Sequence, residues 1–335
     1  MFTRPEDFSD DAVAVALTEG WGLRANAIEY LPMGFGSHHW RVEAGGSLWF
    51  VTADDLRARK WSRSESQSDS LTRLRAALST ARRLRDDGLM FVVAPITTTT
   101  SEILYVTDGY AVALYPYVPG ETPDSDSYQS RDERLAVLDL IAAVHHADGS
   151  TIREALVDDF AIADRDELTA ALGELSAPWD TGPYGDPART LLARHARDVE
   201  HALTGYDTLV AAVQPRRERA VLTHGEPHPR NTLRSGRNLL LIDWDTALLA
   251  PPERDVWTLA DGDPKILDHY EALTGVEMMS DSLALYRLRW DLTEISIYVG
   301  LFRQHHSKTT DTTIAWAGLN DYLDPRRWDT RMTPS

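Results

Sequence analysis

Short apolar runs separated by turn residues dominate the first third of the chain. Their length and composition predict strands at residues 27–31, 38–44, 47–53, 91–94, 103–107 and 110–115. Two pairs of these runs are joined by Gly45-Gly46 and Asp108-Gly109, dipeptides that are typical of two-residue hairpin turns. Because hairpins join antiparallel strands, we expect a small antiparallel sheet in this part of the chain.

A helical period appears between the third and fourth of these runs. Leucines at helical spacing predict an amphipathic helix over residues 70–87, and Gly88 follows it as a typical helix end. A shorter helix is predicted to begin at Ser9 or Asp10, either of which can cap it, and to run to about Leu17. One main helix is therefore expected to accompany the sheet.

Beyond residue 122 the apolar positions recur mostly every three or four residues. They predict helices at residues 128–147, 187–209 and 283–302, with short strands between 221 and 243. The segment PYVPGET, residues 116–122, has the composition of a connector. We therefore predict an α+β protein with a small antiparallel-sheet lobe at residues 1–115 and a larger, mostly helical lobe at residues 123–335.

Composition narrows the function classes. The 335 residues include 34 Lys and Arg against 52 Asp and Glu, a net charge of −18, and no basic stripe is visible, so we expect no nucleic-acid partner. An acidic surface favours cationic ligands but equally serves solubility. The absence of cysteine excludes disulfides, thiolate metal sites and a cysteine nucleophile.

Location and assembly are constrained only weakly. The N-terminus lacks the apolar segment of a signal peptide, and no apolar run approaches the roughly 18–20 residues that a membrane-spanning helix needs. We expect a cytoplasmic protein without a membrane partner, and the sequence leaves monomer and homodimer open.

The densest chemistry lies in residues 221–255, VLTHGEPHPRNTLRSGRNLLLIDWDTALLAPPERD. It offers the carboxylate of Glu226, the amide of Asn231 five residues later, and Asp243 at the end of an apolar run. Amide and carboxylate oxygens are suitable hard ligands for Mg²⁺, which bridges phosphate oxygens. Phosphoryl transfer needs mainly positioning and charge neutralisation, which this set can supply.

The same segment resembles the aminoglycoside phosphotransferases and related small-molecule kinases. Those families carry His-Gly-Asp-x-His-x-x-Asn, a hairpin and then Ile-Asp-Trp-Asp; this chain has HGEPHPRN at 224–231 and IDWD at 242–245. The stretch LAPPERD at 249–255 is similar to the spectinomycin-phosphotransferase-like branch. The resemblance implies a two-lobed protein-kinase-like fold and an ATP- or GTP-dependent transfer to a small molecule.

Carried over to this sequence, the resemblance implies a role for each motif residue. Glu226 stands at the catalytic base, with His224 and Asp255 bracing its loop, while Asn231 and Asp243 stand at the Mg²⁺ positions.

Nucleotide contacts are implied elsewhere. Gly34, Gly36 and Ser37 resemble the loop that covers the nucleotide, and the backbone of Tyr117 and Val118 stands at the hinge that meets adenine.

Two positions depart from the family pattern. Glu226 replaces the usual Asp, and Thr52 stands where the third strand carries the lysine that holds the α- and β-phosphates. The helix at 70–87, which should supply the glutamate partner of that lysine, contains no Glu. Our candidates for a replacement cation are Arg41 and His39, with Lys60 weaker; Arg41 can equally be an exposed strand residue in a salt bridge.

A substrate wall is the last candidate site. Late helices of related phosphotransferases supply acidic groups for a cationic substrate, and helix 283–302 carries Asp291 and Glu294 on one face, next to Trp290. Asp245 joins them as a substrate candidate. The alternative is a core helix with partnered charges, for example Arg287 with Asp291.

Two hypotheses follow. The first is an ATP-dependent O-phosphotransferase acting on a small hydroxylated, cationic molecule such as an aminoglycoside or amino alcohol. The second is a kinase-fold protein that binds ligand or nucleotide without phosphoryl transfer, which the missing lysine and glutamate motivate.

Overall fold

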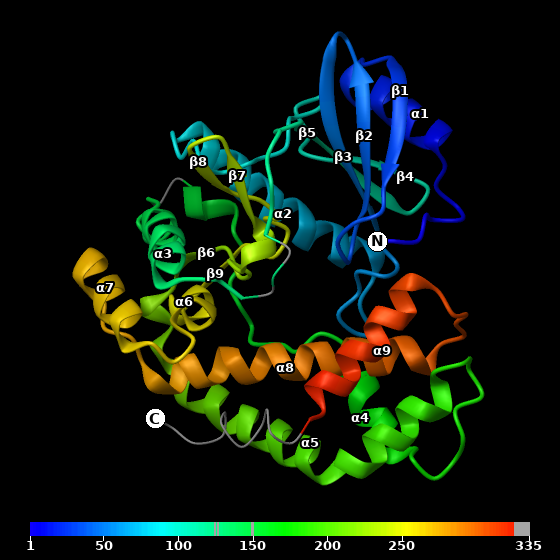
Figure 1. Ribbon diagram of the computed structural model, residues 1–335, viewed down its shortest axis with the longest axis vertical. Helices are drawn as coiled ribbons and strands as arrows, with labels where there is room; N and C mark the ends of the chain where they lie inside the picture. The colour runs from blue at the N-terminus through cyan, green and yellow to red at the C-terminus, as the bar shows by residue number, and fades with distance from the viewer. Residues whose placement is uncertain (124, 126, 149–150, 325–335) are drawn as a thin grey trace. The chain divides into compact units, whose positions relative to one another are not determined.

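The computed structural model describes residues 1–123, 125, 127–148 and 151–324. The chain divides into two compact units, whose elements are drawn in Figure 1. Unit 1 comprises residues 1–59, 67–158 and 218–278, and unit 2 comprises residues 60–66, 159–217 and the chain from residue 279 onward. The lobe boundary expected at residues 116–122 stays a prediction, since this division runs through other segments of the chain.

Unit 1 begins with a five-stranded antiparallel sheet in the order β1-β2-β3-β5-β4. Its elements are α1 (Asp10–Trp21), β1 (Ala25–Leu31), β2 (His38–Ala44), β3 (Ser47–Asp55), α2 (Gln67–Asp86), β4 (Tyr105–Thr107) and β5 (Tyr110–Pro116). The predicted turns are present: the two glycines between β2 and β3 both have positive φ, as do Asp108 and Gly109 between β4 and β5. Ser9 accepts a hydrogen bond from the backbone N–H of Ala12 and caps α1 as predicted.

Strand alternation explains how two helices cover this sheet. Tyr110, Val112 and Leu114 of β5 join the cluster that includes α1, whereas the intervening Ala111 and Ala113 join the cluster that includes α2. β5 is therefore buried on both faces, with small alanines where α2 approaches.

The register of β3 follows the same rule. Thr52 lies opposite Ala113 and His39, and Asp54 lies opposite Ala111, so Thr52 and Asp54 share the face that does not carry α1. The position expected for a lysine and the acidic residue two places later thus lie on one side of the sheet.

The remainder of unit 1 is a helical core into which two small hairpin-like sheets are set. It contains α3 (Arg131–His145), η1 (Thr151–Glu154), β6 (Val221–Thr223), η3 (Pro229–Asn231), β7 (Thr232–Ser235), β8 (Asn238–Leu241), β9 (Leu248–Ala250), α6 (Glu253–Ala260) and α7 (Pro264–Thr274). β6 pairs with β9 and β7 with β8, both antiparallel. Leu138, Ile141, Leu241, Trp244 and Val256 are among the residues of one buried cluster that joins these elements. This core fixes both ends of the segment that carries the motif.

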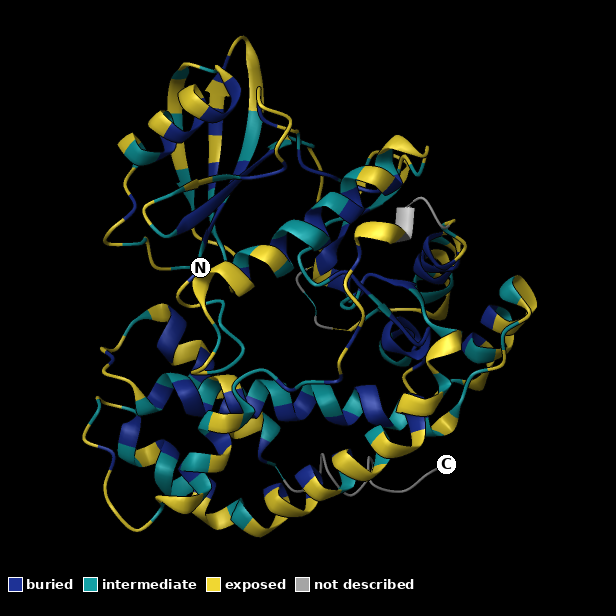
Figure 2. Cartoon of the chain, turned by 180° about the vertical axis from the view of Figure 1, so that it is seen from behind, coloured by how far each residue is buried: buried dark blue, intermediate teal, exposed yellow. Residues whose placement is uncertain are grey.

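Unit 2 is helical, with α4 (Arg165–Gly173), α5 (Gly185–Val213), α8 (Ser280–Arg303) and α9 (Thr310–Tyr322). A 3-10 segment, η2 (Gln214–Arg219), follows α5. Figure 2 shows exposed residues along one side of α5 and buried residues along the other. The buried positions include Ala188, Leu192, Val199 and Tyr206, at spacings that keep them on one face.

One predicted strand did not form. Residues 91–94 make only an isolated bridge, between Val92 and Leu241, because their pairing partner is the last residue of β8 and Pro95 follows immediately. The strand predicted at 103–107 is shortened to β4. The α+β class and the long predicted helices are confirmed.

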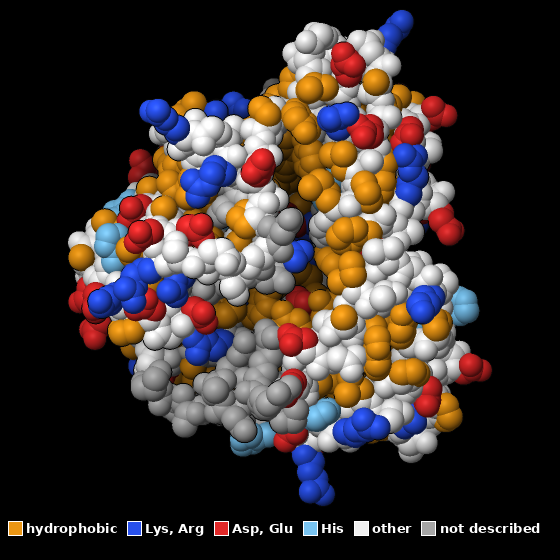
Figure 3. Space-filling model, in the orientation of Figure 1, with side chains coloured by type: hydrophobic (Ala, Val, Ile, Leu, Met, Phe, Trp, Pro, Cys, Tyr) orange, Lys and Arg blue, Asp and Glu red, His pale blue; other side chains and the backbone are white. Residues whose placement is uncertain are grey.

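Two surface properties bear on the partners. On the face of the described residues that Figure 3 shows, basic and acidic side chains are interspersed and form no continuous basic stripe. Within the described part of the chain, no helix combines the length and the apolar character needed to cross a membrane.

Candidate active site

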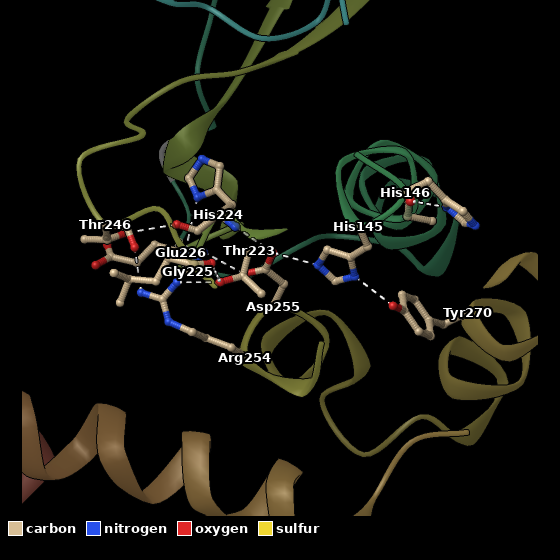
Figure 4. A network of polar contacts seen from close by, with 12 residues as sticks. His145, His146, Thr223, His224, Gly225, Glu226, Thr246, Arg254, Asp255 and Tyr270 are labelled. Carbon is tan, nitrogen blue, oxygen red and sulfur yellow. Dashed lines mark hydrogen bonds and ion pairs between the residues drawn. The ribbon is translucent and has the colours of Figure 1, made fainter. Parts of the chain in front are cut away.

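The motif segment is held by a set of buried polar contacts that we call the bracing network: Thr223, His224, Gly225, Thr246, Arg254, Asp255, His145 and Tyr270 (Figure 4). At its centre, one carboxylate oxygen of Asp255 accepts from the backbone N–H of His224 at 2.8 Å, and the other accepts from that of Gly225 at 2.6 Å. The imidazole Nε2 of His224 lies 2.9 Å from the backbone oxygen of Ile242. Asp255 thus fixes the loop backbone, and His224 ties the loop to the segment after β8.

The carboxylate of Asp255 is in turn positioned by His145, which also contacts Tyr270. His145 contacts Asp255 through Nε2 at 3.1 Å and the hydroxyl of Tyr270 through Nδ1 at 2.7 Å. Burial opposes ionisation of Asp255, but the hydrogen bond from His145 and the nearby His224 and Arg254 hold its pKa below the ordinary value. The carboxylate therefore stays charged where the loop needs an acceptor.

Two features require a glycine at position 225: its backbone conformation and the closeness of the Arg254 side chain. Its φ is 102°, and a Cβ at this position would overlap a guanidinium nitrogen of Arg254. That guanidinium donates to the hydroxyl of Thr223 and to the backbone oxygen of Thr246, each at 2.8 Å. Arg254 therefore fills the space that only a glycine leaves beneath the loop.

Glu226 follows Gly225 in the loop, and its side chain is partly exposed to solvent. The side chain is 33% exposed, and the Nε2 atom of His228 lies 3.6 Å from its carboxylate. The next residue is anchored by Tyr128, which donates to the backbone oxygen of Pro227 at 2.8 Å. The carboxylate is thus carried on a rigid loop and remains accessible to a ligand.

The structure brings Asn231 next to the Asp243 segment. The backbone N–H of Ile242 donates to the backbone oxygen of Asn231 at 3.0 Å. The side-chain Nδ2 of Asn231 donates to the backbone oxygen of Glu226, also at 3.0 Å. Because the amide nitrogen is used in that way, the amide oxygen is the atom left for a cation. Asp243 follows with φ 64°, a conformation that non-glycine residues adopt rarely and often at functional sites.

Three carboxylates and one guanidinium form what we call the carboxylate cluster: Asp54, Asp243, Asp245 and Arg59. Asp54 is buried, Asp245 is half-buried and Asp243 is an exposed residue. Desolvation of its carboxyl group raises the pKa of Asp243 well above its ordinary value, and the charges of Asp245 and Glu226 raise it further. Burial also opposes ionisation of Asp245, but Arg59 outweighs it and lowers the pKa of Asp245. Negative charge exceeds positive charge at this place.

Arg59 links three segments of unit 1. Its Nε donates to Asp54 at 2.8 Å, and its Nη2 donates to Asp245 and, at 3.2 Å, to the Ser37 hydroxyl. Ser37 donates in turn to Asp54 at 2.5 Å. Sequence reasoning missed both Arg59 and Asp54; the basic run RARK directly after β3 was the available signal, and it yielded only Lys60 as a candidate.

The residues predicted to bind nucleotide are distributed as follows. Gly34 and Gly36 have positive φ and form the turn that ends in Ser37. Arg41 forms an ion pair with Glu29 at 2.5 Å, and its side chain is 45% exposed. The exposed alternative weighed for Arg41 is therefore the arrangement that the structure contains.

The connector that carries Tyr117 and Val118 is tied to neighbouring strands. The N–H of Tyr117 donates to the oxygen of Leu48, and Glu121 and Arg234 exchange backbone hydrogen bonds at 3.1 and 2.9 Å. Gly120 permits this approach, because a Cβ there would lie 2.7 Å from the backbone oxygen of Arg234. Contact with adenine through Tyr117 and Val118 stays a prediction.

The other substrate candidates lie on α8, in unit 2. Asp291 is buried, Trp290 donates through Nε1 to the hydroxyl of Tyr322 at 2.8 Å, and Glu294 accepts from the hydroxyl of Tyr298 at 2.5 Å. Asp245, by contrast, lies in unit 1 and is paired with Arg59.

Comparisons with known proteins agree with the motif. Residues 41–285 match the model of the Phosphotransferase enzyme family. The chain is 27% identical over 309 residues to Protein StrN of Streptomyces griseus, covering 89% of this chain and 87% of that protein.

Solved structures share its fold. A spectinomycin phosphotransferase, APH(9)-Ia, in complex with ADP and spectinomycin is similar with a TM-score of 0.74 at 14% identity, covering 98% of this chain and 100% of that chain. A microcompartment-associated aminopropanol kinase gives 0.62 at 15% identity, covering 98% and 99%. The choline kinase LicA from Streptococcus pneumoniae gives 0.54 at 15% identity, covering 94% and 98%. The predicted kinase-like fold is confirmed.

Proposed function

The chain belongs to the Phosphotransferase enzyme family, and from this premise we propose that it is an ATP-dependent O-phosphotransferase acting on a small hydroxylated, cationic molecule. One observation carries the proposal: a braced loop presents Glu226 and holds Asn231 against the segment that ends in Asp243. An amide oxygen and a carboxylate beside an accessible carboxylate are the parts that phosphoryl transfer to an alcohol requires.

Glu226 is the proposed base. It orients the acceptor hydroxyl and takes its proton as the oxygen attacks the terminal phosphoryl group. Its side chain is one methylene longer than the aspartate usual in the family, so the reacting oxygen is held about an ångström further from the loop. His224 positions this loop through its contacts and does not itself touch the reacting atoms.

Asn231 and Asp243 are the proposed Mg²⁺ ligands. Desolvation and then the charges of Asp245 and Glu226 raise the pKa of Asp243, and a divalent cation is favourable beside such a group of carboxylates. In the described part of the chain, no three His, Cys, Asp or Glu side chains form a ready-made metal cage. This suits Mg²⁺, which is held by one or two protein groups plus substrate phosphates. Held by Asn231 and Asp243, Mg²⁺ would supply positive charge to offset the negative charge that develops on the phosphoryl group during transfer.

The substrate class rests on chemistry shared by the structural relatives. Spectinomycin, aminopropanol and choline, which the names of those proteins contain, each combine a hydroxyl group with a cationic nitrogen. We propose that Trp290, Asp291 and Glu294 of α8 recognise such a cation, by charge and by contact with the indole face. Asp245, in unit 1, is a separate substrate candidate. We also propose ATP as the donor, in line with the ADP in the spectinomycin phosphotransferase structure, with GTP as the alternative, and that the protein works in the cytoplasm.

An ADP-release assay tests the proposal. Purified protein is incubated with Mg-ATP and a panel of aminoglycosides and amino alcohols, beside Glu226→Ala and Glu226→Asp. We expect ADP release that depends on one class of acceptor, falls by about 10²–10⁴-fold in Glu226→Ala, and is partly retained in Glu226→Asp. ADP release that no acceptor increases, or that is equal in wild type and Glu226→Ala, would refute it.

The alternative, a binder without transfer, is favoured by Thr52 at the expected lysine position. Calorimetry with each panel compound, with and without Mg-ATP, separates the two. Binding that yields no phosphorylated product over hours identifies a binder, whereas turnover excludes it.

A further inference from the structure

The face of β3 that should carry a phosphate-binding lysine carries Thr52 and, two residues later, Asp54. Asp54 is 2% exposed, and a buried carboxylate requires a cationic or hydrogen-bonding partner. That partner is Arg59, which comes from the turn directly after the strand. A carboxylate and a cation are thus paired on this face, with the acid rather than the base on the strand.

The position of Arg59 is defined by the segments it joins. Its guanidinium contacts Ser37, the last residue of the glycine turn, and Asp245, two residues after the proposed metal ligand Asp243. Ser37 also bonds to Asp54, so the glycine turn, the strand end and the Asp243 segment meet at one cation. A phosphate chain lying between that turn and a metal at Asp243 would pass this guanidinium.

Arg59 also has donors to spare. A guanidinium carries five N–H groups in a planar fork. Nε and Nη2 are used by Asp54, Ser37 and Asp245, whereas Nη1 makes no hydrogen bond to any residue that the structure describes. The side chain is 20% exposed, so a ligand can reach it. Paired N–H groups of this kind match phosphate oxygens.

The other candidate cations are less well placed. Arg41 is engaged by Glu29 and lies further along β2. His39 lies opposite Thr52, but burial lowers its pKa to about 4, so it is neutral at pH 7. Lys60 follows Arg59 directly in the chain, but among the described residues it forms no ion pair with the carboxylate cluster.

We propose that Arg59, held by Asp54, binds the phosphates of the nucleotide in place of the absent strand lysine. The inference rests on the proposed function for its ligand, an ATP-type nucleotide. Asp54 pairs with Arg59 and orients it, as a glutamate on the helix would pair with the lysine. Arg59 and Asp54 together then replace the lysine, whose position holds Thr52, and the glutamate that α2 lacks. Asp245 releases or shares Arg59 when phosphates and Mg²⁺ enter, because the cation then has a stronger anionic partner.

The test compares Mg-ADP with adenosine, which lacks phosphates, by isothermal titration calorimetry. Arg59→Gln is expected to weaken Mg-ADP binding by about 10- to 150-fold, the loss of a hydrogen bond to a charged group, and adenosine binding by less than about 3-fold. Arg57→Gln is the matched control, since Arg57 lies two residues earlier and is ion-paired with Asp7 and Asp55. It should leave both affinities unchanged.

Additional variants guard against a folding defect. Arg59→Gln leaves the Asp54 carboxylate without its cation, so the neutral pair Asp54→Asn/Arg59→Gln is measured beside it. In the Arg59→Gln background, Thr52→Lys places a cation on the same strand face and is expected to recover about 10-fold of the lost Mg-ADP affinity. A folding defect alone would weaken adenosine equally and would not be rescued.

The outcomes are distinct. Equal Mg-ADP affinity in wild type and Arg59→Gln, or a loss confined to Arg41→Gln, would overturn the assignment, as would a wild-type protein that binds no Mg-ADP. Selective loss of Mg-ADP affinity in a protein that transfers no phosphate would support Arg59 while refuting the proposed function. The role of Arg59 in nucleotide binding and the proposed phosphoryl transfer can therefore be refuted separately.

Discussion

Two neighbouring regions of unit 1 surround their carboxylates with opposite kinds of partner. In the bracing network, Asp255 accepts two backbone hydrogen bonds and a contact from His145, and its pKa is lowered. In the carboxylate cluster, Asp243 is an exposed residue among other carboxylates, and desolvation of its carboxyl group together with their charge raises its pKa.

This difference distinguishes a carboxylate that holds the structure together from one that belongs to the proposed reaction site. A carboxylate whose donors are all protein groups contributes to stability and holds its loop, whereas one surrounded by like charge costs stability until a cation arrives. The bracing network is complete without a ligand. The carboxylate cluster holds more carboxylates than cations, which is the pattern expected of the Mg²⁺ and nucleotide site that we propose there.

The same substitution should therefore have opposite consequences in the two regions. Asp243→Asn is expected to lower kcat for phosphoryl transfer by about 10³-fold, because loss of metal-based charge stabilisation costs several kcal/mol. Its free energy of unfolding should be unchanged or higher, since one repelling carboxylate is removed. Steady-state kinetics and urea unfolding measure the two effects, and a large loss of stability would show that Asp243 is structural.

Asp255→Asn is expected, in contrast, to destabilise the protein. Replacing one acceptor oxygen by an amide leaves a buried N–H of the loop facing a donor, and the free energy of unfolding should fall by about 3–5 kcal/mol. Glu29→Gln, in the exposed pair with Arg41, is the control and should change it by less than about 1 kcal/mol. If the two variants unfold at the same urea concentration, the bracing network does not hold the loop.

A pair of glycine substitutions isolates the packing beneath the loop. Gly225→Ala and Gly46→Ala both place a Cβ at positive φ, but only the first meets an obstacle, the Arg254 guanidinium; no atom lies within 4 Å of the second. We expect Gly46→Ala to cost about 1 kcal/mol and Gly225→Ala about 2–3 kcal/mol. Thermal unfolding of both variants measures the difference, and equal costs would mean that Arg254 moves aside freely.

The smallest effect concerns His39, on the sheet face that includes Thr52. Burial lowers the pKa of His39 from 6.5 to about 4, so the unfolded chain binds a proton more tightly between these values. Its contribution to stability is therefore present above pH 6.5 and is lost as pH falls toward 4. His39→Gln should reduce the loss of unfolding free energy between pH 7.5 and 5 by about 1–2 kcal/mol in urea titrations. Parallel curves for the two proteins would show that His39 remains solvated.

The sequence was informative where chemistry is local. Residue spacing in 224–231 and 242–245 indicated the loop and its candidate metal ligands, and alternation and turn dipeptides indicated the sheet. The strand predicted at 91–94 was wrong because its only partner is Leu241, at the end of a distant hairpin. Local propensity contains no information about such a partner.

Arg59 shows the same limit at the site. Its partner Asp245 is 186 residues away, and the pairing depends on how β3 and the segment after β8 are brought together. Nothing in the run RARK distinguishes Arg59 from Arg57, which ion-pairs at the surface. Likewise, the bracing role of Arg254 appears only when the space beneath Gly225 is known.

The central claim, that this site transfers a phosphoryl group to an alcohol, is tested most directly by ³¹P NMR of the reaction mixture. The protein is incubated with Mg-ATP and the acceptor that best stimulates ADP release, with Asp243→Asn as the inactive control. We predict a new phosphomonoester resonance that grows in proportion to ADP and is absent with Asp243→Asn. Conversion of ATP to ADP and inorganic phosphate alone, or no conversion with every acceptor, would contradict the account.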